Sequence, residues 1–115
     1  MLRLLKIYED ELNVYLVLEY QPKGTLLNMI EDNQQISEQT TRVIMEQLLL
    51  TLDFFQKHKV IHSDIKLDNI LVSEIEENTN YDIRVADFGL SVFTPNDEML
   101  TERCGTPGYI APELL

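Results

Sequence analysis

The first twenty residues contain two apolar runs on either side of the polar stretch Glu9 to Asn13. The apolar positions of these runs are Leu2, Leu4, Ile7, Val14, Leu16 and Leu18. Two apolar runs joined by a short polar segment predict a β-hairpin. Pro22 and Gly24 then interrupt the pattern, so we expect the second strand to end and a loop to begin there.

A helical period replaces the strand pattern in the next part of the chain. The segment from Thr25 to Asp32 predicts a short helix with Thr25 as its N-cap, and Ser37 is the N-cap candidate of a longer one. The positions that recur at helical spacing after Ser37 are Val43, Ile44, Gln47, Leu48, Thr51, Leu52 and Phe55. Their stripe is wide, which indicates a helix at the centre of a folded lobe.

A short apolar run at residues 70–72 predicts one strand in the second half of the chain, and Ile83 and Val85 predict a second. The acidic stretch Ser73 to Tyr81 lies between them and predicts a surface loop. Two strands joined by a polar turn bring their outer ends together. We therefore expect Asn69, before the first strand, to lie near Asp87, after the second.

The charge balance is strongly acidic, with a formal net charge of -11 at pH 7. This balance argues against binding to nucleic acid, because a phosphate backbone needs a basic surface. The acidic surface has two interpretations: it attracts basic substrates, or it is simply well solvated. The solvated surface is the favoured interpretation, because a charge total does not locate a patch.

Neither a membrane segment nor a secretory leader is predicted. The most apolar stretch, Val43 to Phe55, is interrupted by Glu46, Gln47 and Asp53, so it is too polar and too short to cross a bilayer. The single cysteine, Cys104, allows no internal disulfide and fits a reducing compartment. We expect the chain to be intracellular, in the cytoplasm.

Three motifs carry the chemistry. The stretch His62 to Asn69 supplies a carboxylate, an ammonium group two residues later and an amide five residues after the carboxylate. Asp87-Phe88-Gly89 supplies a second carboxylate, and Gly105 to Glu113 contains a final Ala-Pro-Glu. In this order and spacing they resemble the catalytic loop, the metal-binding motif and the end of the activation segment of eukaryotic protein kinases.

This resemblance covers residues 1–115 and implies an α+β, protein-kinase-like fold that is only partial. Residues 1–20 would be the last small-lobe strands and the start of the hinge. Residues 21–115 would be the rest of the hinge, the first large-lobe helices, the catalytic loop and the activation segment. The glycine-rich loop and the small-lobe lysine would precede Met1, and the closing helices would follow Leu115. We therefore expect the isolated chain to be marginally stable and inactive.

The resemblance also assigns roles to polar residues in ATP-dependent phosphoryl transfer. Asp64 would orient the substrate hydroxyl and accept its proton, and Lys66 would place a positive charge beside the transferred phosphate. Asn69 and Asp87 would hold Mg²⁺, which prefers oxygen ligands and takes few of them from protein. Thr106 would bridge Asp64 and Lys66 through its hydroxyl.

The nucleotide would lie against the hinge. By resemblance, the adenine meets backbone groups of Glu19 and Gln21, Leu18 guards the inner pocket, and Leu71 forms the floor beneath the ring. Simple membership of the hydrophobic core is an equally good interpretation of the two leucines. His62 matches a packing residue in a stack with Phe88 and Leu4, so it is expected to transfer no proton.

Lys66 and Thr106 follow the pattern of kinases that act on serine or threonine hydroxyls of protein substrates. The chain is most similar to the calcium/calmodulin-dependent group, which makes calmodulin-type regulation an expectation. Two alternatives remain open: a non-catalytic, pseudokinase-like binding module, and an incomplete gene model without independent activity.

One residue of the catalytic stretch departs from the family pattern. Most members carry arginine at the position of Ser63, and that arginine receives an activation-loop phosphate. The usual phosphate-bearing position is Glu102 here. We therefore expect no activation by phosphorylation at that position, with Thr94 and Thr101 as remaining candidate phosphorylation sites.

Overall fold

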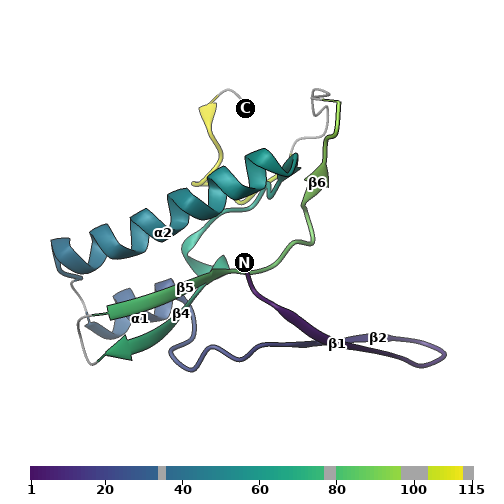
Figure 1. Ribbon diagram of the computed structural model, residues 1–115, viewed down its shortest axis with the longest axis horizontal. Helices are drawn as coiled ribbons and strands as arrows, with labels where there is room; N and C mark the ends of the chain where they lie inside the picture. The colour runs from purple at the N-terminus through teal and green to yellow at the C-terminus, as the bar shows by residue number, and fades with distance from the viewer. Residues whose placement is uncertain (34–35, 77–79, 97–103, 113–115) are drawn as a thin grey trace.

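The computed structural model describes residues 1–33, 36–76, 80–96 and 104–112 (Figure 1). It contains strands, two α-helices and one short 3-10 helix. In chain order these are β1 (Leu4–Glu9), β2 (Val14–Leu18), α1 (Leu26–Asn33), α2 (Glu38–Lys57), β3 (Val60–Ile61), η1 (Leu67–Asn69), β4 (Ile70–Glu76), β5 (Asn80–Val85) and β6 (Val92–Phe93). The strands pair as β1 with β2, β3 with β6, and β4 with β5, each antiparallel.

The long helix α2 begins at the cap that the sequence predicts. The Ser37 Oγ atom accepts a hydrogen bond of 3.0 Å from the Thr40 amide, which satisfies one of the free donors of the first turn. Ile44, Leu48 and Phe55 are buried on one side of the helix. Within the part of the chain that the structure describes, no helix is long and apolar enough to cross a membrane.

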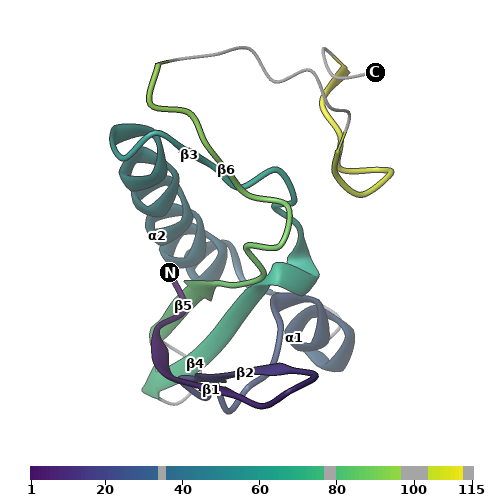
Figure 2. The same ribbon diagram turned by 90° about the vertical axis from the view of Figure 1, so that its right-hand side faces the viewer.

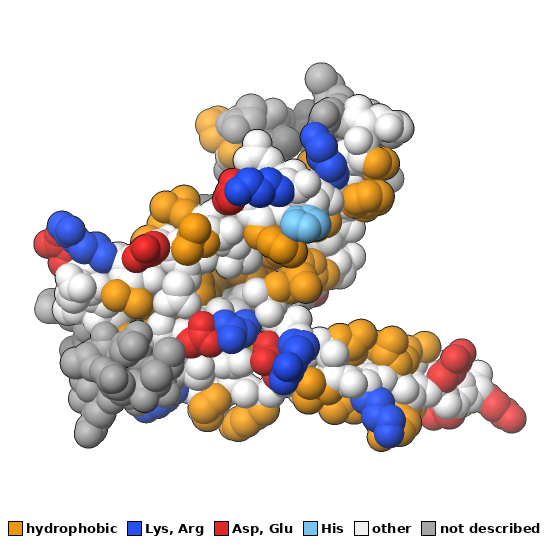
Figure 3. All heavy atoms as spheres, in the orientation of Figure 1, with side chains coloured by type: hydrophobic (Ala, Val, Ile, Leu, Met, Phe, Trp, Pro, Cys, Tyr) orange, Lys and Arg blue, Asp and Glu red, His pale blue; other side chains and the backbone are white. Residues whose placement is uncertain are grey.

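The flanks of this buried face carry apolar side chains as well. The large exposed hydrophobic residues of α2 are Met45, Leu49, Leu50 and Phe54, each between 44% and 63% exposed. Figure 3 shows hydrophobic side chains at the surface along this helix and along the β1–β2 hairpin.

The hairpin of β4 and β5 packs beneath α2 and forms the core with it (Figure 1). Val72 and Val85 are completely buried in this hairpin. The Gln47 side chain joins α2 to β5 twice: Nε2 donates to the Tyr81 carbonyl at 2.7 Å, and Oε1 accepts from the Ile83 amide at 3.1 Å. This pair of bonds fixes the position of β5 on the helix.

The prediction of a surface loop over Ser73 to Tyr81 was wrong at both ends. Strand β4 continues to Glu76, and β5 already begins at Asn80. The reason lies in tertiary packing, because the Tyr81 side chain is buried in the core and its carbonyl is bonded to α2. The acidic composition of the stretch gave no sign of these contacts.

The β1–β2 hairpin is present as predicted and projects away from the core (Figures 1 and 2). Every residue of both strands is exposed. Two contacts tie the base of the hairpin to β5: the Leu2 amide donates to the Val85 carbonyl at 2.8 Å, and Arg84 pairs with Glu19 at 3.4 Å. The loop that follows the hairpin is thereby positioned beside β4.

The short helix α1 also begins as the sequence predicts. The Thr25 hydroxyl accepts from the Asn28 amide at 3.1 Å, and the Asn28 side chain accepts from both the amide and the hydroxyl of Thr25. Thr25 forms a bridge with Leu71 of β4. This reciprocal cap therefore connects the loop after the hairpin to the second sheet.

Candidate active site

The outer ends of β4 and β5 bring two polar residues together. Ile70 pairs with Val85, so Asn69 and Asp87 lie just beyond the same end of the hairpin. The Ala86 amide donates to the Asn69 carbonyl at 2.9 Å and continues the ladder by one step. The expected proximity of the residues that flank the two strands is confirmed.

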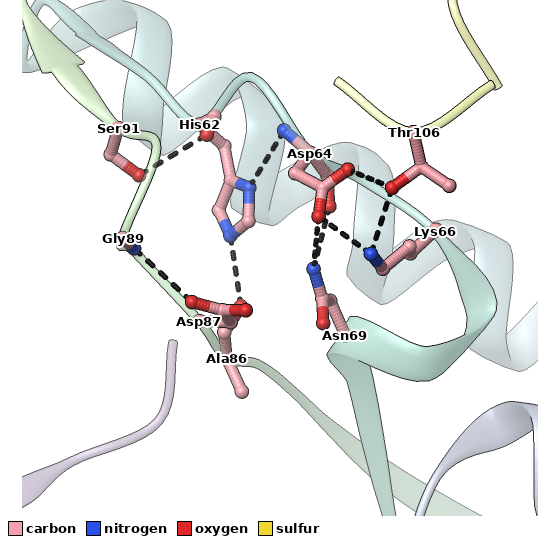
Figure 4. Close-up of polar contacts among 9 residues, drawn as sticks. All are labelled: His62, Asp64, Lys66, Asn69, Ala86, Asp87, Gly89, Ser91 and Thr106. Carbon is pink, nitrogen blue, oxygen red and sulfur yellow. Dashed lines mark hydrogen bonds and ion pairs between the residues drawn. The ribbon is translucent and has the colours of Figure 1, made fainter. Parts of the chain in front are cut away.

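Asp64 lies at the centre of the polar cluster in Figure 4. It is 8% exposed, and its two carboxylate oxygens are bonded to three side chains. Oδ1 accepts from the Thr106 hydroxyl at 2.6 Å, and Oδ2 accepts from Lys66 Nζ at 2.8 Å and from Asn69 Nδ2 at 3.1 Å. Asn69 Nδ2 also donates to the Asp64 backbone carbonyl at 2.9 Å. The carboxylate orientation is therefore fixed on both sides.

Thr106 completes a closed triangle with Asp64 and Lys66 (Figure 4). Its hydroxyl donates to Asp64 and accepts from Lys66 Nζ at 2.8 Å. A hydroxyl has one proton to donate and two lone pairs, so it serves both neighbours at once. The structure contains the bridging contacts that the sequence predicts for Thr106.

The same contacts keep Asp64 and Lys66 ionised. Hydrogen bonds from Lys66 and then Thr106 hold the pKa of Asp64 below its ordinary value, and the bond to Asp64 raises the pKa of Lys66. The lowered pKa of Asp64 means that its contribution to stability is present above the ordinary aspartate pKa and is lost as the pH falls through the lowered one. Lys66 contributes below its ordinary pKa and loses that contribution as the pH rises through the raised one.

His62 is held by backbone groups on both sides of its ring. The Asp64 amide donates to Nδ1 at 3.3 Å, so Nε2 carries the proton and donates to the Ala86 carbonyl at 2.9 Å. The ring is buried and lies 4.9 Å from that of Phe88, measured between centroids. His62 therefore packs, as expected, with Phe88. Leu4, the third expected member of the stack, is 48% exposed on β1.

Asp87 occupies an unusual backbone conformation at the end of β5. Its φ angle is 58°, in the left-handed region, and its side chain accepts from the Gly89 amide at 3.2 Å. The residue is exposed, unlike Asp64. The left-handed turn follows the end of β5. The Asp87 carboxylate therefore lies outside the sheet, at the end of the hairpin where Asn69 lies.

The oxygen donors at this edge fit a hard divalent cation. Asn69 uses its amide nitrogen for Asp64, and Figure 4 shows its amide oxygen turned away from that carboxylate. One amide oxygen and one carboxylate are what Mg²⁺ uses when phosphates and water supply its other ligands. Among the described residues, no group of three or more His, Cys, Asp and Glu side chains could hold a metal ion.

The residues expected to form the hinge make backbone contacts of their own. The Glu19 amide donates to the Arg3 carbonyl at 3.0 Å, and the Gln21 carbonyl accepts from the Gly24 amide at 3.2 Å. The loop is paired with β4 beside Leu71, through the Thr25 bridge. Leu18 is 44% exposed on β2. It is therefore not a residue of the hydrophobic core in this structure.

Ser63 adopts a left-handed conformation with a φ angle of 69°. Its hydroxyl oxygen is buried, and among the described residues it has no hydrogen-bond partner. The residue lines a pocket of about 210 Å³ together with Asp64, Cys104 and Thr106. The serine thus leaves open space beside Asp64 and offers no charge there.

The candidate phosphorylation sites have different outcomes. Thr94 is only 8% exposed, and its hydroxyl donates to the Lys59 carbonyl at 3.4 Å. The prediction that Thr94 is available for modification was therefore wrong, because the residue is buried against the chain between α2 and β3. Thr101 and Glu102 lie outside the described residues.

One contact of the site was missed by the sequence interpretation. The Ser91 hydroxyl donates to the His62 backbone carbonyl at 3.2 Å, across 29 positions of the chain (Figure 4). A serine that follows Asp87-Phe88-Gly89-Leu90 carries no periodic or motif signal. Only the pairing of β6 with β3 reveals this contact.

Gly105 holds Thr106 in place through a close approach to Ser63. Its φ angle is +117°, and a Cβ atom there would lie 3.2 Å from both the Ser63 carbonyl oxygen and the Ile110 Cγ1 atom. We expect Gly105→Ala to cost about 1–3 kcal/mol more than Gly108→Ala. Gly108 is the matched control, since its φ angle is +92° but a Cβ atom there meets nothing within 4 Å. Denaturant unfolding measures the difference, and equal losses would contradict the proposed close approach.

Comparisons with known proteins agree with this geometry. The family described as protein kinase domain matches residues 1–115. The liver/testis isoform of the phosphorylase b kinase gamma catalytic chain from Bos taurus is 38% identical over 112 residues, which are 97% of this chain and 26% of that protein. Aurora kinase C from Mus musculus is 37% identical over 114 residues, 99% of this chain and 39% of that protein.

A third relative is the probable serine/threonine-protein kinase 2 of Plasmodium falciparum. It is 36% identical over 114 residues, which are 99% of this chain and 22% of that protein. Because the family match covers all of its residues, the chain belongs to the protein kinase domain family. The chain spans about a quarter of the length of the phosphorylase b kinase gamma catalytic chain and of the Plasmodium kinase.

Proposed function

We propose that this chain carries the catalytic loop and the metal-binding motif of an ATP-dependent protein kinase that acts on serine or threonine hydroxyls. The observation that carries this proposal is the closed network of Asp64, Lys66, Asn69 and Thr106. The network converges on one carboxylate, which is kept ionised by its neighbours. Phosphoryl transfer asks a protein mainly for such fixed positions and charges.

Each member of the network has a proposed role. Asp64 orients the acceptor hydroxyl and receives its proton late, because an aspartate with a lowered pKa is a weak base. Lys66 presents its positive charge to the transferred phosphate, and Thr106 holds both side chains in register. Mg²⁺, when bound with the nucleotide, neutralises phosphate charge. Asn69 and Asp87 are the residues that would hold it.

The adenine is proposed to lie between the hinge and β4. Backbone groups of Glu19 and Gln21 would meet its edge, Leu71 would lie beneath its ring, and Leu18 would border the pocket. The Thr25 bridge supports this arrangement, because it sets the loop after the hairpin beside Leu71. Residues 1–20 would then belong to the small lobe and residues 21–115 to the hinge and the large lobe.

The acceptor class is tested by labelling. The full-length protein that contains these residues is incubated with Mg²⁺, γ-labelled ATP and peptides that carry a single serine, threonine or tyrosine. We expect label on serine and threonine only. Label on tyrosine would contradict the acceptor class, and nucleotide binding without any transfer would favour the pseudokinase-like module.

Thr106 offers a sharper test of the network. We expect Thr106→Val to reduce kcat/KM for peptide about 10-fold, because both the carboxylate and the ammonium group lose a hydrogen-bond partner. Thr106→Ser keeps the hydroxyl and should retain most of the activity. Steady-state kinetics compare the two variants with the unmodified protein. An equal loss in both variants would contradict the proposed role of the hydroxyl, because Thr106→Ser retains that group.

We also propose a form of regulation, a cellular location and a class of partner. Calmodulin-type control is proposed from the sequence resemblance alone, and a reducing, cytoplasmic location is proposed from the single cysteine. The partner is a protein substrate with an accessible serine or threonine.

A further inference from the structure

The segment that follows Asp87 is attached to the catalytic stretch by a short two-stranded ladder. Strand β6 pairs with β3, with Val60 opposite Phe93 and Ile61 opposite Val92. Figure 2 shows the two strands side by side at the end of α2. A ladder of two residue pairs is short for independent stability, so contacts at its ends matter.

A hydroxyl residue closes each end of this ladder. At one end, the Ser91 hydroxyl donates to the His62 carbonyl at 3.2 Å. At the other end, Thr94 uses both of its donors on the Lys59 carbonyl, its amide at 2.8 Å and its hydroxyl at 3.4 Å. We call these two residues, Ser91 and Thr94, the hydroxyl clamp.

The receiving carbonyls belong to well-fixed backbone. Lys59 follows the end of α2 in a left-handed conformation, with a φ angle of 58°. His62 is buried and bonded to backbone at both ring nitrogens. The clamp therefore joins the segment after Asp87 to the two ends of the strand that leads into Asp64.

The catalytic stretch offers no arginine to a phosphate. Position 63 is a serine, and residues 88–102 contain no lysine, arginine or histidine, although Lys59 and Arg103 flank the segment. The two basic residues of the stretch 62–69 are His62 and Lys66. His62 is bonded to backbone at both nitrogens, and Lys66 is paired with Asp64 at 2.8 Å. A phosphate on this segment would find no arginine of the catalytic stretch to receive it.

We propose that Ser91 and Thr94 are positioning residues that order the segment after Asp87 through neutral hydrogen bonds, without a phosphate. This inference rests on the proposed kinase function. It means that ordering of the segment does not depend on phosphorylation. The burial of Thr94, which is 8% exposed, supports it, because a polar group removed from water needs a hydrogen-bond partner. The clamp holds the segment beside β3, the strand that leads into His62 and Asp64.

The clamp is tested by amide hydrogen exchange on the full-length protein after phosphatase treatment. We expect the amides of residues 92–94 to stay protected after treatment. Ser91→Ala with Thr94→Val should speed their exchange about 10-fold, the effect of losing a bond of typical strength. The β4–β5 amides serve as the internal reference and should not change. Release of residues 92–94 by phosphatase alone, or full protection in the double variant, would overturn the proposal.

Matched variants separate the clamp from a general loss of structure. Thr51→Val is the control, because the Thr51 hydroxyl also donates to a backbone carbonyl, that of Gln47 at 2.9 Å, but within α2. Exchange at residues 92–94 should be unchanged in Thr51→Val and restored in Ser91→Thr with Thr94→Ser. Faster exchange in the control, or no restoration in the conservative variant, counts against the clamp.

Peptide kinetics distinguish failure of the clamp from failure of the proposed function. The Ser91→Ala, Thr94→Val protein should show a KM for peptide raised about 5- to 10-fold, with the KM for ATP unchanged. Fast exchange with unchanged kinetics would overturn the clamp as a positioning device. Absence of transfer in the unmodified protein, with residues 92–94 protected, would instead overturn the proposed function.

Discussion

Asp64→Asn is expected to reduce phosphoryl transfer by about 10²- to 10⁴-fold, the usual contribution of a positioned acid or base. The amide cannot accept the proton of the acceptor hydroxyl. It also replaces one acceptor oxygen of the carboxylate with a donor nitrogen, so a bond from Thr106, Lys66 or Asn69 is lost. Steady-state kinetics on the full-length protein measure the loss in kcat. The KM for ATP should change little, because Asp64 makes no proposed contact with the nucleotide.

Asp53→Asn is the matched control for this substitution. Asp53 is an exposed aspartate of α2 that pairs with Lys57 at 2.6 Å, and exposed helix pairs of this kind contribute little. Its replacement should leave kcat unchanged. A fully active Asp64→Asn protein, or an equal loss in the control, would remove the proposed role of Asp64.

Asp87→Asn is expected to lower kcat/KM about 100-fold and to raise the Mg²⁺ concentration needed for half-maximal activity. An amide oxygen carries less negative charge than a carboxylate, so a divalent cation would be held more weakly. A 100-fold loss of kcat/KM is only part of the transition-state stabilisation that a bound metal ion provides, because the variant weakens the metal site without abolishing it. Neighbouring structure should survive, because the Gly89 amide can still donate to the remaining side-chain oxygen.

Asp82→Asn provides the comparison for Asp87. Asp82 lies on β5, the strand that precedes Asp87, and pairs with Arg84 at 2.6 Å. Magnesium titration of fluorescent-nucleotide binding gives a readout that is independent of turnover. We expect a weaker magnesium response in Asp87→Asn and an unchanged one in Asp82→Asn. An unchanged response in both would exclude Asp87 from the metal site.

The elements that the sequence predicted correctly depend on local signals. Ser37 and Thr25 cap their helices as expected, because an N-cap is decided by the amides two or three residues ahead. The neighbouring positions of Asn69 and Asp87 also followed from the strand pattern. A hairpin fixes its own ends once its register is set, so distant parts of the chain add little.

The features that escaped prediction depend on residues far apart in the chain. The extent of β4 and β5 was underestimated, because the burial of Tyr81 depends on α2. The sequence pattern marked Gln47 only as a position of the helical stripe and gave no sign that it bonds the Tyr81 carbonyl. Ser91 and Thr94 contact carbonyls 29 and 35 positions away. Those acceptors are backbone groups, which every residue carries, so no residue type marks them in a sequence.

Positive φ angles at three residues have a consequence for how the catalytic geometry arises. Lys59, Ser63 and Asp87 all adopt left-handed conformations without being glycine, at a cost of roughly 1 kcal/mol each. A free peptide with this sequence would relax out of that shape. The arrangement around Asp64 is therefore imposed by the packing of α2 and the β4–β5 hairpin. Weakening the core at Val72 or Phe55 would then loosen the arrangement around Asp64, although the substitution lies outside the polar cluster.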